Sequence, residues 1–369
     1  MYRRAAFTLV ELLVTVTIIG MLASMLLFGL LKVQSQTQVS RTKSTITKVD
    51  ALLRPRWDGF GTRRLPINTI GMSPKDAAEL RLVALRQIQR MELPDHWAEV
   101  STAPAELKKI NGSNSGVTLS RTALSEAFLR YYNTVGVNKP GADPPNNANG
   151  KPSKQYQAAE CLYMILTVGA LDDRNGRELF LDSEIGDADN DGAPEFIDGW
   201  GMPIRMIRWP VGFVDDPRQD SSTYTRFGHL SSIMPAKSPS GAAAPLVACK
   251  PDAITYHDAL DPRRVDSEAF LIYPLIFSNG PDRIEDIYTG TDDQVRDDPY
   301  VDLRNDSSPC GNYDPLATFT AGTPSIGLPK WLGIPHDLKA FRYGSEQPSN
   351  GKLNHYDNVH NHHLDASFR

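Results

Sequence analysis

The longest run of hydrophobic side chains in the chain extends from Phe7 to Leu31, and Glu11 is its single charged residue. A helix over this run would be roughly 37 Å long, which is enough to cross a hydrocarbon core of about 30 Å. Arg3 and Arg4 precede the run, and positively charged residues favour the cytoplasmic side of a membrane segment. The pattern therefore predicts one membrane-spanning helix, with the N-terminus in the cytoplasm and the rest of the chain on the other side.

Glu11 argues against the two simplest alternatives, a secretory signal peptide and a plain signal anchor. The apolar part of a signal peptide has only about 7–15 residues. An ionised carboxylate inside a membrane is costly unless it has a partner, and such groups are usually functional. The run from Phe7 to Leu31 contains no Lys, Arg or His. A counter-charge must therefore come from outside this helix or from a new chain terminus.

The residues around Glu11 resemble the class III signal of type IV pilins and type II secretion pseudopilins, on the sequence AFTLVELL at positions 6–13. The resemblance implies that a prepilin peptidase cleaves between Ala6 and Phe7, and that the new amine of Phe7 is methylated. It also implies that Glu11 neutralises the Phe7 amine of a neighbouring subunit during filament assembly. Two positions differ from the usual pattern, because Ala6 replaces a Gly and Phe28 stands where a Pro is common. An ordinary membrane anchor is the alternative.

Hydrophobic periodicity continues beyond the membrane segment, over a stretch from Lys32 to Arg54 that lacks Gly and Pro. Its apolar positions near helical spacing are Val39, Ile46, Val49 and Leu53. We expect the membrane helix to continue as an amphipathic stalk and to end at Pro55, which cannot donate a backbone hydrogen bond. The helix from Phe7 to Arg54 would then be roughly 70 Å long. Resemblance to pilins implies that a C-terminal head packs on this stalk.

Downstream of the stalk, short apolar patterns alternate with turn residues. Ser73 and Pro74 predict the start of a helix. A second helix is expected over residues 158–168, and strands are expected over residues 204–209 and 269–277. The 27 Gly and 27 Pro residues indicate many turns and loops. The expected fold is α+β and pilin-like: a long N-terminal transmembrane and stalk helix, and a C-terminal head with a small antiparallel sheet and inserted helices.

The 369 residues divide into six segments on this interpretation. They are a prepilin leader (1–6), a transmembrane helix (7–31), an amphipathic stalk (32–55), a helical insert (56–170), a β-containing head with acidic loops (171–310) and a C-terminal extension (311–369). The extension contains His355, His360, His362 and His363. We interpret these histidines as part of a polar terminus, with zinc or nickel binding as the alternative.

An acidic loop in the head has the spacing of an EF-hand calcium loop. Counted from Asp187, acids occupy positions 1, 3, 5, 9 and 12, and Gly192 occupies position 6. The five acids are Asp187, Asp189, Asp191, Glu195 and Asp198. Asp198 replaces the usual Glu, and Pro194 stands where a flanking helix would begin. The sequence therefore predicts a loop that bound Ca²⁺ stabilises, rather than a calcium sensor, with a solvated acidic turn as the alternative.

A second acidic loop follows the strand expected over residues 269–277. It resembles the C-terminal loop of major type II secretion pseudopilins, in which Ca²⁺ holds the C-terminus on the head. Matched by position, the resemblance implies four ligands, Ser278, Asp282, Asp292 and Asp293. The spacer is longer here and carries Arg283, and a turn with surface acids is the alternative. Residues 198–203, with the sequence DGWGMP, also resemble the Asp-x-Trp-Gly-x-Pro motif of the same pseudopilins.

Other features of the sequence argue against several classes of function. It has no P-loop, dinucleotide-binding, metalloprotease or nucleophile-elbow motif, so we do not expect an enzyme. The net charge of −5 argues against nucleic-acid binding. The three cysteines indicate no disulfide framework: Cys161 is expected to be a buried thiol, and a bridge between Cys249 and Cys310 is left open.

Together these features predict a membrane-inserted structural subunit, and the resemblance implies that it belongs to a type II secretion pseudopilus, held in the inner membrane with a periplasmic head. The resemblance implies that its partners are the prepilin peptidase, the inner-membrane assembly platform, and other copies of itself or other pseudopilins. One alternative is a type IV pilin for adhesion, motility or DNA uptake. The other is a membrane-tethered binding protein that does not polymerise.

Overall fold

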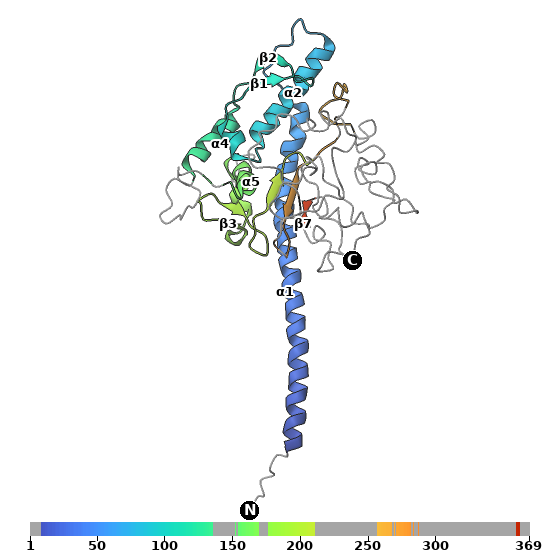
Figure 1. Ribbon diagram of the computed structural model, residues 1–369, viewed down its shortest axis with the longest axis vertical. Helices are drawn as coiled ribbons and strands as arrows, with labels where there is room; N and C mark the ends of the chain where they lie inside the picture. The colour runs from blue at the N-terminus through green and yellow to red at the C-terminus, as the bar shows by residue number, and fades with distance from the viewer. Residues whose placement is uncertain are drawn as a thin grey trace, which may run out of the picture.

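A single long helix, α1 (Leu9–Gly59), organises the structure, as Figure 1 shows. The computed structural model describes residues 9–135, 152, 154–169, 176–210, 257–267, 269, 271–281, 283, 287 and 359–361. Within this part of the chain, the N-terminal half of α1 projects away from the head, and the C-terminal half packs against it (Figure 1). Burial follows the hydrophobic pattern of the sequence. Leu9 and the large apolar side chains described after it are exposed as far as Val33, whereas Ile46, Val49 and Leu53 are fully buried.

The end of α1 lies beyond the position expected from the sequence. The helix passes through Pro55 and ends at Gly59. Pro55 removes one backbone donor, but side chains of the last turn hold the helix against the head. Arg56 donates to the carbonyl of Ile165 at 2.6 Å, and Trp57 packs edge-on against two aromatic rings. The predicted end at Pro55 is therefore wrong by about one turn, because tertiary contacts outweigh one missing hydrogen bond.

Shorter helices make up much of the head that packs on the second half of α1. Those of the described residues are η1 (Phe60–Thr62), α2 (Pro74–Glu92), α3 (Trp97–Ser101), α4 (Ala123–Thr134), α5 (Gln157–Val168), η2 (Gly176–Leu179) and η3 (Asp182–Glu184). The helix predicted after Ser73 is α2, which starts there because the Ser73 hydroxyl accepts the backbone N–H of Asp76 at 3.1 Å. The helix predicted over residues 158–168 is α5. Both predictions are confirmed.

Short antiparallel strands form three small sheets in the described part of the chain. The strands are β1 (Glu106–Lys108), β2 (Asn114–Thr118), β3 (Ile185–Gly186), β4 (Glu195–Phe196), β5 (Arg205–Ile207), β6 (Leu275–Ser278) and β7 (Val359–His360). β1 pairs with β2, β3 pairs with β4, and β6 pairs with both β5 and β7. In the third sheet, Phe277 lies opposite Arg205 on one side and His360 on the other. The expected α+β class is confirmed, although β5 and β6 are shorter than the predicted strands.

β7 belongs to the segment for which a polar terminus is predicted, yet its surroundings are buried. Val359 and Asn361 are both buried, and the Asn361 amide donates to Asp50 of α1 at 2.8 Å and to the carbonyl of Pro274 at 3.0 Å. The amide oxygen of Asn361 accepts the backbone N–H of Ile276 at 2.9 Å. For residues 359–361 the prediction is therefore wrong, because satisfied hydrogen bonds allow a polar side chain to be buried. The histidines outside the described residues are His355, His362 and His363.

One hydrophobic core joins the stalk, the helices and the sheets. α1 contributes Ile46 and Leu53, α5 contributes Leu162 and Ile165, and β6 contributes Ile276, all of them fully buried. α5 is buried along most of its length and packs against α1, β4 and β5. The segments expected to be a helical insert and a β-containing head therefore share one core.

Candidate functional site

The N-terminal half of α1 carries the first candidate site, an exposed apolar surface. Leu9 is 81% exposed and Phe28 is 73% exposed. Among the described residues, α1 is the one helix that is long and apolar enough to cross a membrane. Glu11 is exposed on this surface, whereas the predicted processing residues Ala6 and Phe7 lie outside the described residues. The fold therefore places a carboxylate within a surface suited to lipid or to other apolar helices.

Hydroxyl groups on the same surface are satisfied within the helix itself. The hydroxyls of Thr15, Thr17 and Ser24 donate to backbone carbonyls one turn earlier, at 2.9, 2.8 and 2.7 Å. Such bonds allow hydroxyls to enter lipid without an unsatisfied donor. Glu11 is consequently the residue of this surface whose chemistry is least compatible with lipid.

The first acidic loop connects β3 to β4 and turns tightly. Asn190 and Gly192 have φ values of 58° and 98°, in the left-handed region that a sharp reversal requires. The backbone N–H of Gly192 donates to Asp187 at 3.1 Å, and Asp191 accepts the next backbone N–H at 2.8 Å. Carboxylate oxygens of Asp187, Asp189 and Asp191 lie within 4.8 Å of one another. The loop thus gathers the acids at positions 1, 3 and 5 of the predicted calcium loop.

Glu160 of α5 lies beside this loop and was not predicted from the sequence. One oxygen each of Glu160, Asp189 and Glu195 lies within 4.8 Å of the others, and both glutamates are fully buried. The Trp97 indole N–H donates to Oε2 of Glu160, and the backbone N–H of Ala188 donates to Oε2 of Glu195 at 3.1 Å. The Oε1 atom of each glutamate has no hydrogen-bond partner within the described residues. Glu160 of α5 therefore belongs to the same cluster of carboxylates as Asp189 and Glu195 of the loop.

Burial and nearby negative charge raise the pKa of both glutamates. Burial is the main cause at Glu160, and repulsion from Asp191 raises its pKa further. The hydrogen bond from Trp97 lowers the pKa, but the net result is a pKa of about 10. Burial again dominates at Glu195, where repulsion from Asp189 and its neighbours helps to raise the pKa to about 9. Both groups are therefore protonated near pH 7 unless a cation enters. A divalent cation would hold them ionised and displace their protons.

Asp198, at position 12 of the predicted loop, makes its hydrogen bonds outside the cluster of loop aspartates. Its Oδ1 atom accepts the backbone N–H groups of Trp200 and Met202, both at 2.8 Å, and its Oδ2 atom accepts the hydroxyl of Ser278 at 2.6 Å. The structure therefore brings together two predicted ligands from different loops, and it does not group Asp198 with the aspartates. The other predicted ligands of the second loop, Asp282, Asp292 and Asp293, lie outside the described residues, and their role stays a prediction.

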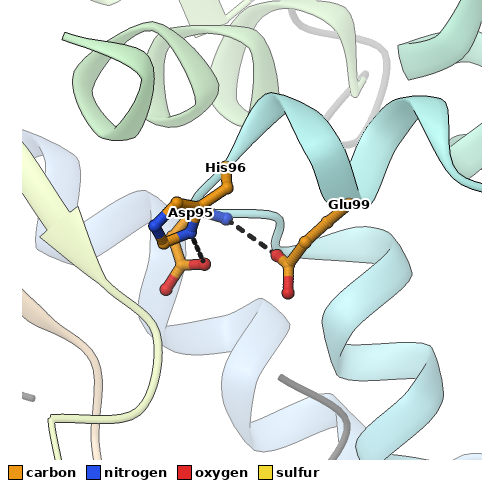
Figure 2. Close-up of side chains that lie close together, drawn as sticks. All are labelled: Asp95, His96 and Glu99. Atoms are coloured by element: carbon orange, nitrogen blue, oxygen red, sulfur yellow. Dashed lines mark hydrogen bonds and ion pairs between the residues drawn. The ribbon is translucent and has the colours of Figure 1, made fainter. Parts of the chain in front are cut away.

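A further group of metal-type side chains consists of Asp95, His96 and Glu99, at the start of α3 (Figure 2). His96 Nδ1 lies 2.8 Å from Asp95, and the backbone N–H of Asp95 donates to Glu99 at 3.2 Å. The guanidinium of Arg208 donates to both oxygens of Glu99, and its backbone N–H donates to Asp95 at 3.1 Å. Arg208 is itself almost fully buried and lies over the ring of Trp209. This arginine supplies the positive charge that the buried acids need.

Arg208 and Asp95 stabilise each other's charge. Burial opposes ionisation of Asp95, but Arg208 and His96 together hold its pKa well below the usual range. Burial also opposes the charge on Arg208, yet Asp95 and Glu99 raise its pKa further. For Glu99, burial prevails and raises the pKa. We assign this group a structural role, because it ties α3 to the segment that follows β5.

Cys161 in α5 is a buried free thiol, as predicted. Burial raises its pKa well above the usual value, which disfavours the reactive thiolate. Cys249 and Cys310 lie outside the described residues, so the bridge between them is untested.

Comparison with known proteins identifies the N-terminal segment. Residues 1–27 match the family model described as "Prokaryotic N-terminal methylation motif", the prepilin-type cleavage and methylation motif of type IV pilins and pseudopilins. The resemblance seen at positions 6–13 is thereby confirmed. No curated protein and no solved structure matched the chain.

The motif supports a subunit of the type IV pilin or pseudopilin kind, and the long N-terminal helix with an α+β head is consistent with that kind. The proteins that carry this motif form a family of structural subunits and not of enzymes. The motif implies processing by a prepilin peptidase and assembly into filaments, and the apolar half of α1 indicates membrane anchoring.

Proposed function

We propose that this chain is a structural subunit of a type II secretion pseudopilus, which polymerises through the apolar half of α1. The observation that carries the proposal is the exposed position of Glu11 on a helix surface of large apolar side chains, within a cleavage and methylation motif. In this arrangement α1 is stored in the inner membrane, with its N-terminus in the cytoplasm and the head in the periplasm. The assembly platform would then draw subunits into the filament.

Cleavage before Phe7 would create an ammonium group at the start of the apolar helix. In a medium of low dielectric constant, this cation and a carboxylate attract each other strongly, and each lowers the cost of burying the other. Pairing between Phe7 of one subunit and Glu11 of the next fixes the offset between neighbouring helices. Apolar side chains along the exposed half of α1 then pack against those of other subunits, and the heads remain outside the bundle.

The order of elements in the head supports a pseudopilin rather than a type IV pilin. The DGWGMP turn leads into β5, β5 pairs antiparallel with β6, and β6 ends at Ser278, where the second acidic loop begins. This order follows the two motifs that resemble major pseudopilins. Type IV pilins of adhesion, motility or DNA uptake are the second candidate, because they share the N-terminal motif.

A pair of substitutions in the native host tests the proposal. Glu11→Leu should abolish secretion into the medium and cross-linking between subunits, while the amount of protein in the membrane stays unchanged. Thr17→Val is the matched control, because the Thr17 hydroxyl is satisfied within the helix at 2.8 Å and its loss should leave secretion intact. Loss of surface pili with normal secretion would instead indicate a type IV pilin. If neither process changed, the chain would instead be a membrane-tethered protein that does not polymerise.

Mass spectrometry of the mature protein tests the processing step separately. The proposal expects a chain that begins at Phe7 and carries an N-methyl group. A purified native chain that still begins at Met1 would contradict assembly through a freed amine.

A further inference from the structure

Two overlapping groups of carboxylates meet at Asp189, where α5 lies beside the β3–β4 loop. One group contains Asp187, Asp189 and Asp191, and the other contains Glu160, Asp189 and Glu195. Within each group, one oxygen per residue lies within 4.8 Å of the others. Ca²⁺ binds oxygen atoms at about 2.3–2.6 Å, so that ligands on opposite sides of the ion are about 5 Å apart. The spacing in each group therefore fits the coordination sphere of Ca²⁺.

Two buried oxygen atoms indicate a ligand independently of this spacing. Glu160 and Glu195 are fully buried, and the Oε1 atom of each has no hydrogen-bond partner in the part of the chain that the structure describes. Buried polar atoms are normally satisfied, because leaving them without a partner costs the whole desolvation penalty. The Oε2 atoms are held by the N–H groups of Trp97 and Ala188. Each glutamate is thus fixed by one oxygen and keeps the other for a ligand.

The group around Arg208 shows a different solution to the same electrostatic problem. There, the guanidinium donates to both oxygens of Glu99, so the protein supplies its own cation. At Glu160 and Glu195, one oxygen of each side chain receives an N–H and the other receives no hydrogen bond from the described residues. A bound cation would complete this second group as Arg208 completes the first.

We propose that the junction of α5 and the β3–β4 loop binds Ca²⁺, and that Glu160 rather than Asp198 completes the coordination by the loop. Ca²⁺ takes six to eight oxygen ligands in flexible geometry, which carboxylates and water can provide here. Mg²⁺ requires a tighter octahedral shell and retains its waters, and Zn²⁺ sites usually include Cys or His. Asp198 is unsuited to the role because both of its oxygens already accept hydrogen bonds from the turn and from Ser278.

This site goes beyond the proposed function and does not depend on it. An ion held by Glu160 and Asp189 would connect a helix of the hydrophobic core to a loop of the head. Because Ca²⁺ would bind the folded protein and not the unfolded chain, it would raise stability by mass action. The effect would be largest at the calcium concentrations found outside the cytoplasm.

Tb³⁺ luminescence offers a direct test on the full-length protein in detergent. Tb³⁺ replaces Ca²⁺ in oxygen-rich sites, and Trp97, which donates a hydrogen bond to Glu160, is close enough to sensitise its emission. After removal of metal with a chelator, we expect sensitised emission that Ca²⁺ displaces at a concentration at least tenfold lower than Mg²⁺. Trp97→Phe should remove most of this emission. Absence of displaceable emission, together with a melting temperature that millimolar Ca²⁺ does not change, would overturn the proposal.

Substitutions identify the ligands. Glu160→Gln and Asp189→Asn should each weaken Ca²⁺ binding at least tenfold and abolish the calcium-dependent rise in melting temperature. Glu160→Gln keeps the side-chain shape, so the melting temperature in chelator reports whether the variant still folds, and Asp189→Asn provides an independent test. Asp182→Asn is the matched control, because its side chain is 94% exposed in the preceding turn, and it should bind Ca²⁺ normally. Unchanged affinity in Glu160→Gln, or an equal loss in Asp198→Asn, would refute the assignment of Glu160.

Discussion

The hydroxyl of Ser278 donates a 2.6 Å hydrogen bond to Asp198, and this bond joins the end of β6 to the turn that leads into β5. The second oxygen of Asp198 accepts two backbone N–H groups of the same turn. Within the turn, the N–H of Gly199 donates to the hydroxyl of Thr42 on α1 at 2.9 Å. One buried carboxylate thus helps to hold the sheet, the turn and the stalk in a fixed arrangement.

Gly199 is expected to be essential for the close approach of this turn to α1. A Cβ atom at this position would lie 2.3 Å from the carbonyl oxygen of Gln38, and the helix backbone cannot move aside cheaply. Gly199→Ala should therefore lower the free energy of unfolding by about 1–3 kcal/mol, as overpacking does in cores. Chemical denaturation of the full-length protein in detergent measures this change. Gly61→Ala is the control, because its Cβ would meet nothing within 4 Å, and equal stability of the two variants would contradict the close approach.

Asn361 is expected to anchor the C-terminal segment to the head and the stalk. Its side chain bonds Asp50, Pro274 and the backbone of Ile276, all in buried surroundings. Asn361→Ala should lower the free energy of unfolding by about 2 kcal/mol, because it leaves buried groups without partners. It should also speed proteolysis near the C-terminus. Thr47→Ala, on the exposed face of α1, should change neither quantity, and a protease-resistant Asn361→Ala chain would show that β7 does not depend on this side chain.

Local sequence patterns predicted those features that neighbouring residues determine. The apolar run after Phe7, the stalk periodicity and the start of α2 at Ser73 each depend on residues within a few turns of one another. The same holds for Asp187, Asp189 and Asp191, which a tight turn gathers. Pro55 alone misplaces the predicted end of α1, because the tertiary contacts of the following turn, which carry the helix on to Gly59, are not visible in the local sequence.

Contacts between distant parts of the chain could not be predicted in this way, because no local sequence pattern marks the residues that make them. Glu160 lies in a different element from Asp189, and nothing in the apolar pattern of α5 marks it as a partner of the loop. Arg208, which follows β5, likewise bonds Glu99 of α3, a residue far from it in the sequence. β7 was missed because two residues are too short to show strand periodicity, and Asn361 resembles any polar residue of a terminus.

Glu184 provides a pH-dependent contact between η3 and the stalk. Burial opposes its ionisation, but hydrogen bonds from Lys48, the Leu181 N–H and Thr45 lower its pKa below the ordinary 4.5. Because the pKa is lower in the folded state, the ionised group stabilises the fold above pH 4.5, and this contribution is lost as the pH falls through the lowered pKa. Glu184→Gln should therefore be less stable than the wild type at neutral pH, with a difference that shrinks as the pH falls below 4.5 and through the lowered pKa of Glu184. Chemical denaturation at a series of pH values checks this trend. The exposed Glu178→Gln is the control and should be as stable as the wild type throughout. A stability difference for Glu184→Gln that does not change with pH would contradict the prediction.

Arg208 is expected to be a charged residue of the head on which stability strongly depends. Its guanidinium is almost fully buried and donates to both oxygens of Glu99, while its backbone N–H donates to Asp95. Arg208→Met would leave two buried acids without their cation, and breaking a buried pair from one side typically costs about 3–5 kcal/mol. Arg177→Met is the matched control, because Arg177 pairs with an exposed aspartate, and such surface pairs contribute about 1 kcal/mol or less. Both variants are compared by chemical denaturation of the full-length protein. If Arg208→Met destabilised the protein no more than the control, the acids around it would have to be neutral or hydrated, and the assignment of this group as a buried ion-pair network would fail.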